Sequence, residues 1–171
     1  MSCTDNSKKV PMKTGLPTKE TVQRWLIKAE QGHAMAQYNL AISYYNGVGM
    51  PKDWSKALYW FKEAGEQGIV DALYMLGMMY QFGKGVEPDV KEAFQWYYKA
   101  AELGDAESQF RVGNSYCLGR GIEKNAAAAV VWWRKAAEQG HSKARHNLGV
   151  AYYRGEGVTM NKEEADKWFK K

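Results

Sequence analysis

A repeat with a period of 36 residues constrains the fold of this chain more than any other feature. The pattern begins at Gly32 and returns at Gly68, Gly104 and Gly140, so neighbouring starts are always 36 residues apart. A fixed period between about 20 and 50 residues is typical of proteins that stack one small structural unit several times. The sequence therefore predicts an array of four such units.

Apolar and small side chains recur at fixed places in each unit. Leucine or valine stands ninth, alanine or glycine tenth and tyrosine thirteenth. We expect Leu76, Tyr80 and Trp96 to be buried at the centre of the stack, because no unit can bury its apolar face alone. The small tenth residue, such as Gly77, should let two helices approach closely. A tryptophan also recurs late in each unit, at Trp60, Trp96, Trp132 and Trp168.

Turn and capping residues divide each unit into two helices, which we call helix A and helix B. A Gly-x-Gly pair follows the tyrosine in every unit, and glycine reaches positive φ at little steric cost. A short polar side chain comes next and can accept a hydrogen bond from a free N–H group at the start of helix B. Those residues are Asp53, Asp89, Asn125 and Asn161. The predicted fold class is all-α, with no β-sheet.

The repeats are expected at residues 32–67, 68–103, 104–139 and 140–171. Residues 18–31 are interpreted as a lone helix B that caps the first repeat, so that one domain spans 18–171. Residues 1–17 are polar and aperiodic and are expected to form a tail without the apolar core of a signal peptide. No run of about 18 apolar residues predicts a membrane span.

Cys3 leaves two interpretations of the N-terminus open. With the following Thr-Asp-Asn-Ser-Lys, it is similar to the start of a mature bacterial lipoprotein, which would carry a lipid anchor and reside in the periplasm. The alternative is an ordinary N-terminus of a bacterial cytoplasmic protein. The native sequence upstream of this cysteine would distinguish them.

The repeat resembles the Sel-one-like repeat (SLR) family, a relative of the tetratricopeptide repeat. The resemblance rests on Ala36, Leu40, Tyr44 and the Gly-Val-Gly at 47–49, and on the sequence KAAEQG at 135–140. It implies a right-handed α/α superhelix and a non-enzymatic role in assembling proteins. Bacterial members of the family include adaptors linked to the envelope or to secretion, and immunity proteins that neutralise a secreted toxin.

The predicted partner-binding surface lies on helix A. At about 100° per residue, places five, six, nine, ten and thirteen of the repeat share one side of helix A, which faces the core. The fourth, seventh, eleventh, fourteenth and fifteenth places share the opposite side. The corresponding places line the concave groove of tetratricopeptide proteins. They are rich in Tyr, Met and Phe, which are common in protein interfaces. We expect a protein or peptide to be bound by Met35, Tyr38, Ile42, Tyr45, Asp71, Tyr74, Met78, Phe82, Glu107, Phe110, Asn114, Lys143, His146, Tyr153 and Arg154. For the seventh place, packing between adjacent A helices is the alternative.

No catalytic residue, metal site or cofactor is predicted. His141 and His146 are five residues apart and do not share a helix face, which disfavours a zinc pair. The motifs of zinc proteases, of serine hydrolases with a nucleophile elbow and of phosphate-binding loops are absent. The alternative function is a cell-wall or β-lactam-acting enzyme of the cysteine-rich SLR type. Cys3 and Cys117 are the only cysteines, so pairs that recur with the repeat are missing.

The net charge of +5 would suit an acidic partner or nucleic acid. However, the lysines recur with the repeat on helix B, as expected for a solvated helix face. Nucleic acid is therefore not an expected partner. The sequence predicts a binding scaffold without naming its partner.

Overall fold

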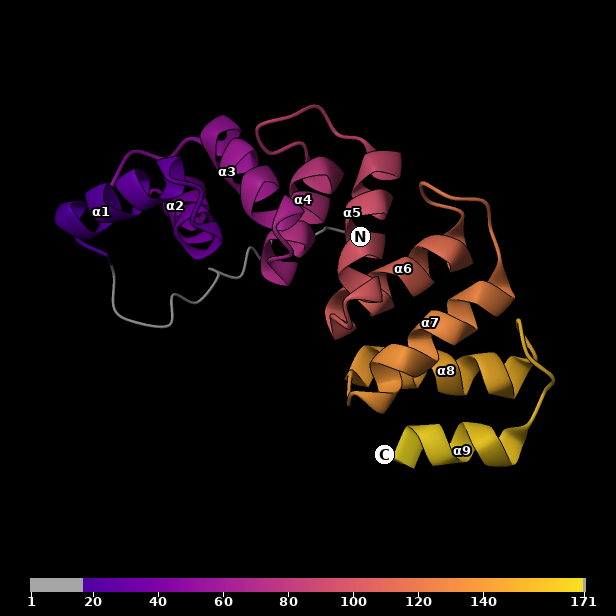
Figure 1. Ribbon diagram of the computed structural model, residues 1–171. Coiled ribbons are helices and arrows are strands. Elements are labelled where there is room, and N and C mark those ends of the chain that lie inside the picture. The colour runs from indigo at the N-terminus through magenta and orange to yellow at the C-terminus, as the bar shows by residue number, and fades with distance from the viewer. Residues whose placement is uncertain (1–16, 171) are drawn as a thin grey trace. The chain divides into compact units, whose positions relative to one another are not determined.

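Residues 17–170, which the computed structural model describes, form nine α-helices and no β-strand (Figure 1). This confirms the all-α prediction, and each predicted repeat holds one pair of helices. The predicted tail up to residue 16, including Cys3, lies outside the described residues. The helices are α1 (Lys19–Glu30), α2 (Ala34–Asn46), α3 (Trp54–Glu66), α4 (Val70–Phe82), α5 (Val90–Glu102), α6 (Ala106–Leu118), α7 (Ala126–Glu138), α8 (Ser142–Arg154) and α9 (Lys162–Lys170).

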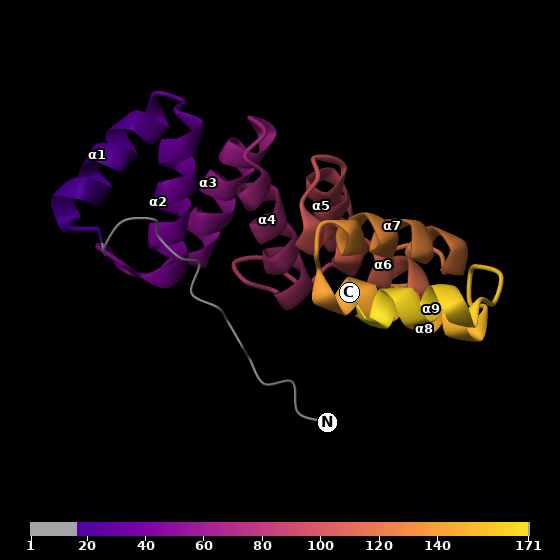
Figure 2. The same ribbon diagram turned by 90° about the horizontal axis from the view of Figure 1, so that it is seen from below.

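The chain divides into two compact units, of which the first ends at Ile69 and the second begins at Val70. Unit 1 holds α1, α2 and α3, and unit 2 holds α4 to α9. Within each unit, every helix packs against the next one along the chain. Figures 1 and 2 show these consecutive helices following one another in chain order, joined by short loops. Helices α2, α4, α6 and α8 are the A helices, whereas α3, α5, α7 and α9 are the B helices.

The predicted capping residues begin the B helices. The Oδ1 atoms of Asp53, Asn125 and Asn161 each accept a hydrogen bond from the backbone N–H three residues later, at 3.0, 2.9 and 3.0 Å. Oδ1 of Asp89 accepts two hydrogen bonds, from the backbone N–H groups two and three residues later, at 2.9 and 3.0 Å. These side chains replace the intrahelical partners that the first N–H groups of a helix lack. The start of each helix B is therefore determined by a residue in its own sequence.

The core forms where the repeat predicts it. Leu76, Tyr80 and Trp96 are 0, 8 and 7% exposed, which confirms their predicted burial. A Cβ atom added to Gly77 would lie 2.5 Å from Cε1 of Tyr97, so the small tenth residue does permit a close approach of α4 and α5. No helix among the described residues is long and apolar enough to cross a lipid bilayer.

Candidate functional site

In unit 1, the predicted contact residues differ in exposure. Met35 is 58% exposed. Tyr38 and Tyr45 are half-buried, and their ring centroids lie 5.9 and 6.3 Å from that of Phe61. Ile42 is only 2% exposed, so the expectation that it offers a contact surface is wrong. Ile42 lies next to the side of helix A that faces the core. Burying an aliphatic side chain there stabilises the folded protein.

In unit 2, the predicted residues form an exposed group and a half-buried group. Phe82 and Tyr153 are each 53% exposed. The half-buried residues pack partly between helices, as the alternative for the seventh place anticipated for Tyr74 and Phe110. The exposed members are Asp71, Phe82, Lys143, His146, Tyr153 and Arg154, and the half-buried members are Tyr74, Met78, Glu107, Phe110 and Asn114.

Arg111 on α6, which is missing from the predicted set, links two A helices. Its Nη2 donates a hydrogen bond of 3.2 Å to Oη of Tyr74 on α4. The same nitrogen lies 2.9 Å from Oε1 of Glu107, one turn earlier on α6. The guanidinium carbon stands 5.4 Å from the ring centroids of both Tyr74 and Tyr97, within the range of cation–π attraction. The spacing of Glu107 and Arg111, four residues apart on one helix face, is the signal that could have revealed this pair.

His141, the N-cap of α8, continues these contacts to the third A helix. Its Nδ1 accepts a hydrogen bond of 3.2 Å from the backbone N–H of Ala144, so the ring hydrogen is assigned to Nε2. Nε2 lies 3.0 Å from Oε2 of Glu107 and donates to it. The ring also stacks on Phe110, with centroids 4.6 Å apart. His141 therefore connects the start of α8 to α6.

Asn114 on α6 completes the connection between α6 and α8. Its Oδ1 accepts hydrogen bonds from Nε1 of Trp133, at 3.0 Å, and from Nδ2 of Asn147 on α8, at 3.2 Å. This side chain is therefore engaged within the protein. We call the polar residues that join α4, α6 and α8 the A-helix network, namely Tyr74, Glu107, Arg111, Asn114, His141 and Asn147.

The pKa values of Tyr74 and Glu107, two members of the A-helix network, are shifted away from neutral pH. Burial raises the pKa of Tyr74, so its phenol stays neutral at neutral pH. Burial alone would raise the pKa of Glu107, but the hydrogen bond from His141 and the charge of Arg111 outweigh it and hold the pKa below the ordinary 4.5. Neither group is therefore positioned to exchange a proton near neutral pH, as a general acid or base must do.

Three large apolar side chains stand exposed in the last turns of the A helices of unit 2. Phe82 is the last residue of α4, Leu118 is the last residue of α6, and Tyr153 is the penultimate residue of α8. They are 53, 58 and 53% exposed. We call Phe82, Leu118 and Tyr153 the apolar edge. The A-helix network holds the three helices that carry it, so its side chains stand on a fixed frame.

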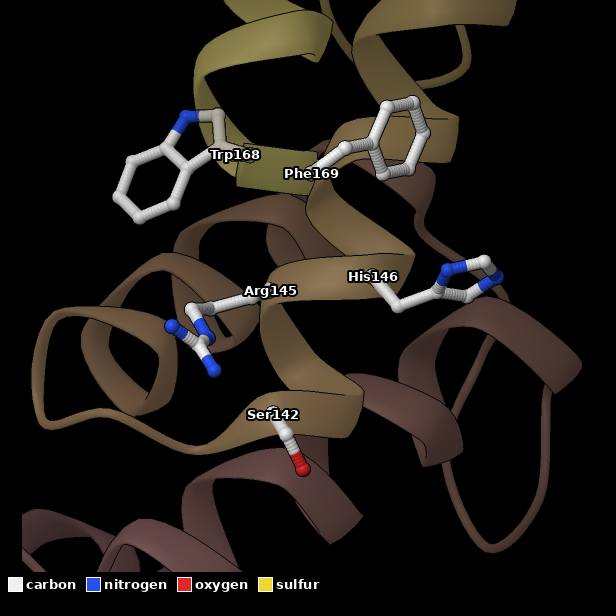
Figure 3. Close-up of a pocket in the computed structure, with 5 residues that line it drawn as sticks. All are labelled: Ser142, Arg145, His146, Trp168 and Phe169. Carbon is white, nitrogen blue, oxygen red and sulfur yellow. The ribbon is translucent and has the colours of Figure 1, made fainter. Parts of the chain in front are cut away.

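A separate small pocket lies between α8 and α9. It has a volume of about 100 Å³ and is lined by Ser142, Arg145, His146, Trp168 and Phe169. Figure 3 shows Arg145 and Trp168 on one side, and His146 and Phe169 on the other. The last two rings have centroids 5.8 Å apart. Within residues 17–170, no group of three His, Cys, Asp or Glu side chains could hold a metal ion.

Comparison with known proteins identifies the repeat. The Sel1 repeat model matches residues 34–69, 70–105, 106–141 and 142–171. The chain is similar to the crystal structure of a protective antigen of uropathogenic Escherichia coli strains, which displays an SLR fold. The two are 39% identical with a TM-score of 0.82, over 87% of this chain and 32% of the antigen.

A Sel1 repeat protein from Oxalobacter formigenes is 35% identical, with a TM-score of 0.78 over 89% of this chain and 61% of that protein. An immunity protein from Pseudomonas aeruginosa is 26% identical, with a TM-score of 0.53 over 93% of this chain and 59% of that protein. The chain thus spans about a third of the length of the Escherichia coli antigen and about three-fifths of the Oxalobacter formigenes protein. No curated protein matches the chain significantly.

Proposed function

This chain belongs to the Sel1 repeat family, and on that premise we propose that it is a non-enzymatic scaffold that binds a partner protein at the apolar edge of unit 2. The observation that carries the proposal is the exposure of Phe82, Leu118 and Tyr153 at equivalent ends of three A helices. Large apolar side chains at the centre of an interface commonly contribute most of the binding free energy.

The frame beneath the apolar edge supports this proposal. Tyr74 and Arg111 connect α4 to α6, and Glu107 and His141 connect α6 to α8. A surface that is held in place before binding loses less conformational entropy when the partner docks. Asp71 and Lys143, both exposed on the A helices, give the surroundings charges of both signs, which suits selection of one partner over general attraction to polyanions.

The class of partner follows from the relatives. One similar structure is that of an immunity protein from Pseudomonas aeruginosa, which favours a partner that is itself a folded protein, such as a secreted toxin. A role as an adaptor linked to the envelope or to secretion uses the same surface and the same chemistry. The cysteine-rich enzyme alternative is not favoured, because Cys117 is a free thiol and cysteine pairs that recur with the repeat are missing.

Removing two members of the apolar edge tests the proposal. We expect Phe82→Ala with Tyr153→Ala to weaken binding of the partner captured from the source organism by at least about 30-fold, since one aromatic anchor commonly contributes 2 kcal/mol or more. Melting temperature should change little, because both side chains are 53% exposed. Isothermal titration of the purified partner measures the change.

The matched control is Leu103→Ala with Val131→Ala. These side chains are 57 and 53% exposed and lie outside the A helices of the same unit. The control should bind like the wild type. Unchanged binding by the apolar-edge variant, or an equal loss in the control variant, would place the partner elsewhere.

A further inference from the structure

The residue between the two glycines of each Gly-x-Gly loop has the same backbone setting in all four repeats. Its N–H group donates a hydrogen bond to the carbonyl oxygen five residues earlier, at 3.1 Å for Val48, 2.9 Å for Lys84, 3.0 Å for Arg120 and 3.0 Å for Glu156. This bond belongs to the Schellman motif, in which the chain closes the end of a helix. The same bond forms with valine, lysine, arginine and glutamate, so the loop backbone does not determine which side chain stands here.

An apolar side chain is common at this place, because it often contacts the last turn of the helix that the motif closes. The first repeat follows this preference with Val48, whereas unit 2 carries Lys84, Arg120 and Glu156. Positive charge also suits the C-terminal end of a helix, but Glu156 at the same place shows that the helix dipole does not decide the residue type. The requirements of the helix end therefore do not account for the charges in unit 2.

The loops after α4, α6 and α8 differ in net charge. Residues 83–89 hold one basic and two acidic side chains, which gives −1. Residues 119–125 hold two basic side chains and one acidic side chain, which gives +1. Residues 155–161 hold one acidic and no basic side chain, which gives −1. Of these three loops, the one after α6 alone is positive.

Two basic side chains lie near Leu118, the central member of the apolar edge. Arg120 and Lys124 are both exposed, and Arg120 comes two residues after Leu118. The loop turns back on itself, so that the Cβ atom of Lys124 would lie 3.4 Å from a Cβ atom added to Gly119, the residue next to Leu118. Within residues 17–170, no carboxylate forms an ion pair with Arg120 or Lys124. An exposed apolar side chain and two positive charges without an ionic partner therefore stand together at the end of α6.

We propose that the partner protein at the apolar edge places an Asp or Glu side chain beside Leu118, where Arg120 and Lys124 bind its carboxylate. This inference rests on the proposed function and adds the charge of the partner's contact surface. A guanidinium forms paired, charge-assisted hydrogen bonds with a carboxylate, and a lysine ammonium can add another. A carboxylate on a protein is expected rather than nucleic acid, because the loops after α4 and α8 are negative and would repel a row of phosphates.

Two peptides that differ in one side chain test the charge. Acetyl-SWEWS-amide carries one carboxylate between two tryptophans, and acetyl-SWQWS-amide is its neutral match. We expect the full chain to bind the glutamate peptide about threefold more tightly, since an exposed ion pair changes an affinity by up to about fivefold. NMR titration at millimolar peptide should locate both peptides by shifts of the Leu118 and Gly119 amides. The preference should disappear in concentrated salt, which screens exposed charges.

Arg120→Gln with Lys124→Gln should abolish the preference and leave binding of the glutamine peptide unchanged. Both side chains are exposed, and valine occupies the place of Arg120 in the first repeat, so folding should be normal. The matched control is Lys143→Gln with Lys170→Gln, which removes the same charge from exposed places at the start of α8 and the end of α9. The control should keep the preference, and thermal melts verify that all three proteins fold.

The outcomes separate this inference from the proposed function. Equal affinity of the wild type for the two peptides, with shifts at Leu118, would overturn the carboxylate site and leave the apolar edge as a binding surface. No binding of either peptide, shifts confined to residues away from the end of α6, or an equal loss of preference in the control would also overturn it. Binding of a DNA duplex at the same amides would assign the positive charge to nucleic acid instead. The proposed function is tested separately, by Phe82→Ala with Tyr153→Ala and the captured partner.

Discussion

Leu148→Ala is expected to lower the free energy of unfolding by about 2–5 kcal/mol, the range found when large side chains are truncated in protein cores. Leu148 is 0% exposed and lies in the core of unit 2. Many of its neighbours in that cluster are alanines, including Ala129, Ala136 and Ala144. Such short side chains cannot move into the space that the leucine leaves. We therefore expect a persistent cavity and a loss toward the upper end of the range.

Leu103→Ala makes the same chemical change on the surface and is the control for Leu148→Ala. Leu103 is 57% exposed, so its truncation should change the free energy of unfolding by no more than about 0.5 kcal/mol. Urea denaturation followed by circular dichroism measures both variants. Similar midpoints for the two would show that the ninth place of the repeat does not hold the stack together.

Gly121→Ala is expected to produce the second large loss of stability. Gly121 lies in the loop between α6 and α7 at φ +74°, and a Cβ atom added there would lie 2.2 Å from the backbone oxygen of Val90, at the start of α5. A backbone atom cannot rotate away as a side chain can. The contact between this loop and α5 would have to open, and overpacking of this kind costs about 1–3 kcal/mol.

Gly104→Ala separates that clash from the backbone strain. Gly104 has φ +96°, and a Cβ atom added there would meet no other atom within 4 Å. The free energy of unfolding of this variant should fall by only about 1–2 kcal/mol, which is the cost of a positive φ for a residue with a side chain. In thermal denaturation, the melting temperature of Gly121→Ala should thus be well below that of Gly104→Ala. Equal melting temperatures would mean that the loop between α6 and α7 does not contact α5 closely.

The repeat predicted the helices well because the residues that begin and end them are local. Asp89, for example, caps α5 through N–H groups two and three residues away. The burial of Leu76 also followed from its ninth place in the repeat. Every repeat carries leucine or valine at this place, where the side chain packs between helices. Such information lies within a single period of the sequence.

The candidate site was harder to predict because its contacts join different repeats. Helical geometry assigns a side of the helix to each residue but does not state which neighbouring side chain reaches it. Tyr74 was expected to face a partner, yet its hydroxyl accepts a hydrogen bond from Arg111, 37 residues later. Ile42 was assigned to the same side and is buried. Arg111 was missed because its column carries asparagine or methionine in the other repeats.

Hydroxyl-radical footprinting of the chain with and without its captured partner tests the proposed function most directly, because it reports the solvent exposure of individual side chains. We expect binding to protect Phe82, Leu118 and Tyr153 from oxidation. Leu103 and Val131, which are equally exposed in the free protein, should keep their reactivity. Protection of Leu103 and Val131 with an unprotected apolar edge would contradict the proposal that the A-helix ends of unit 2 form the binding site.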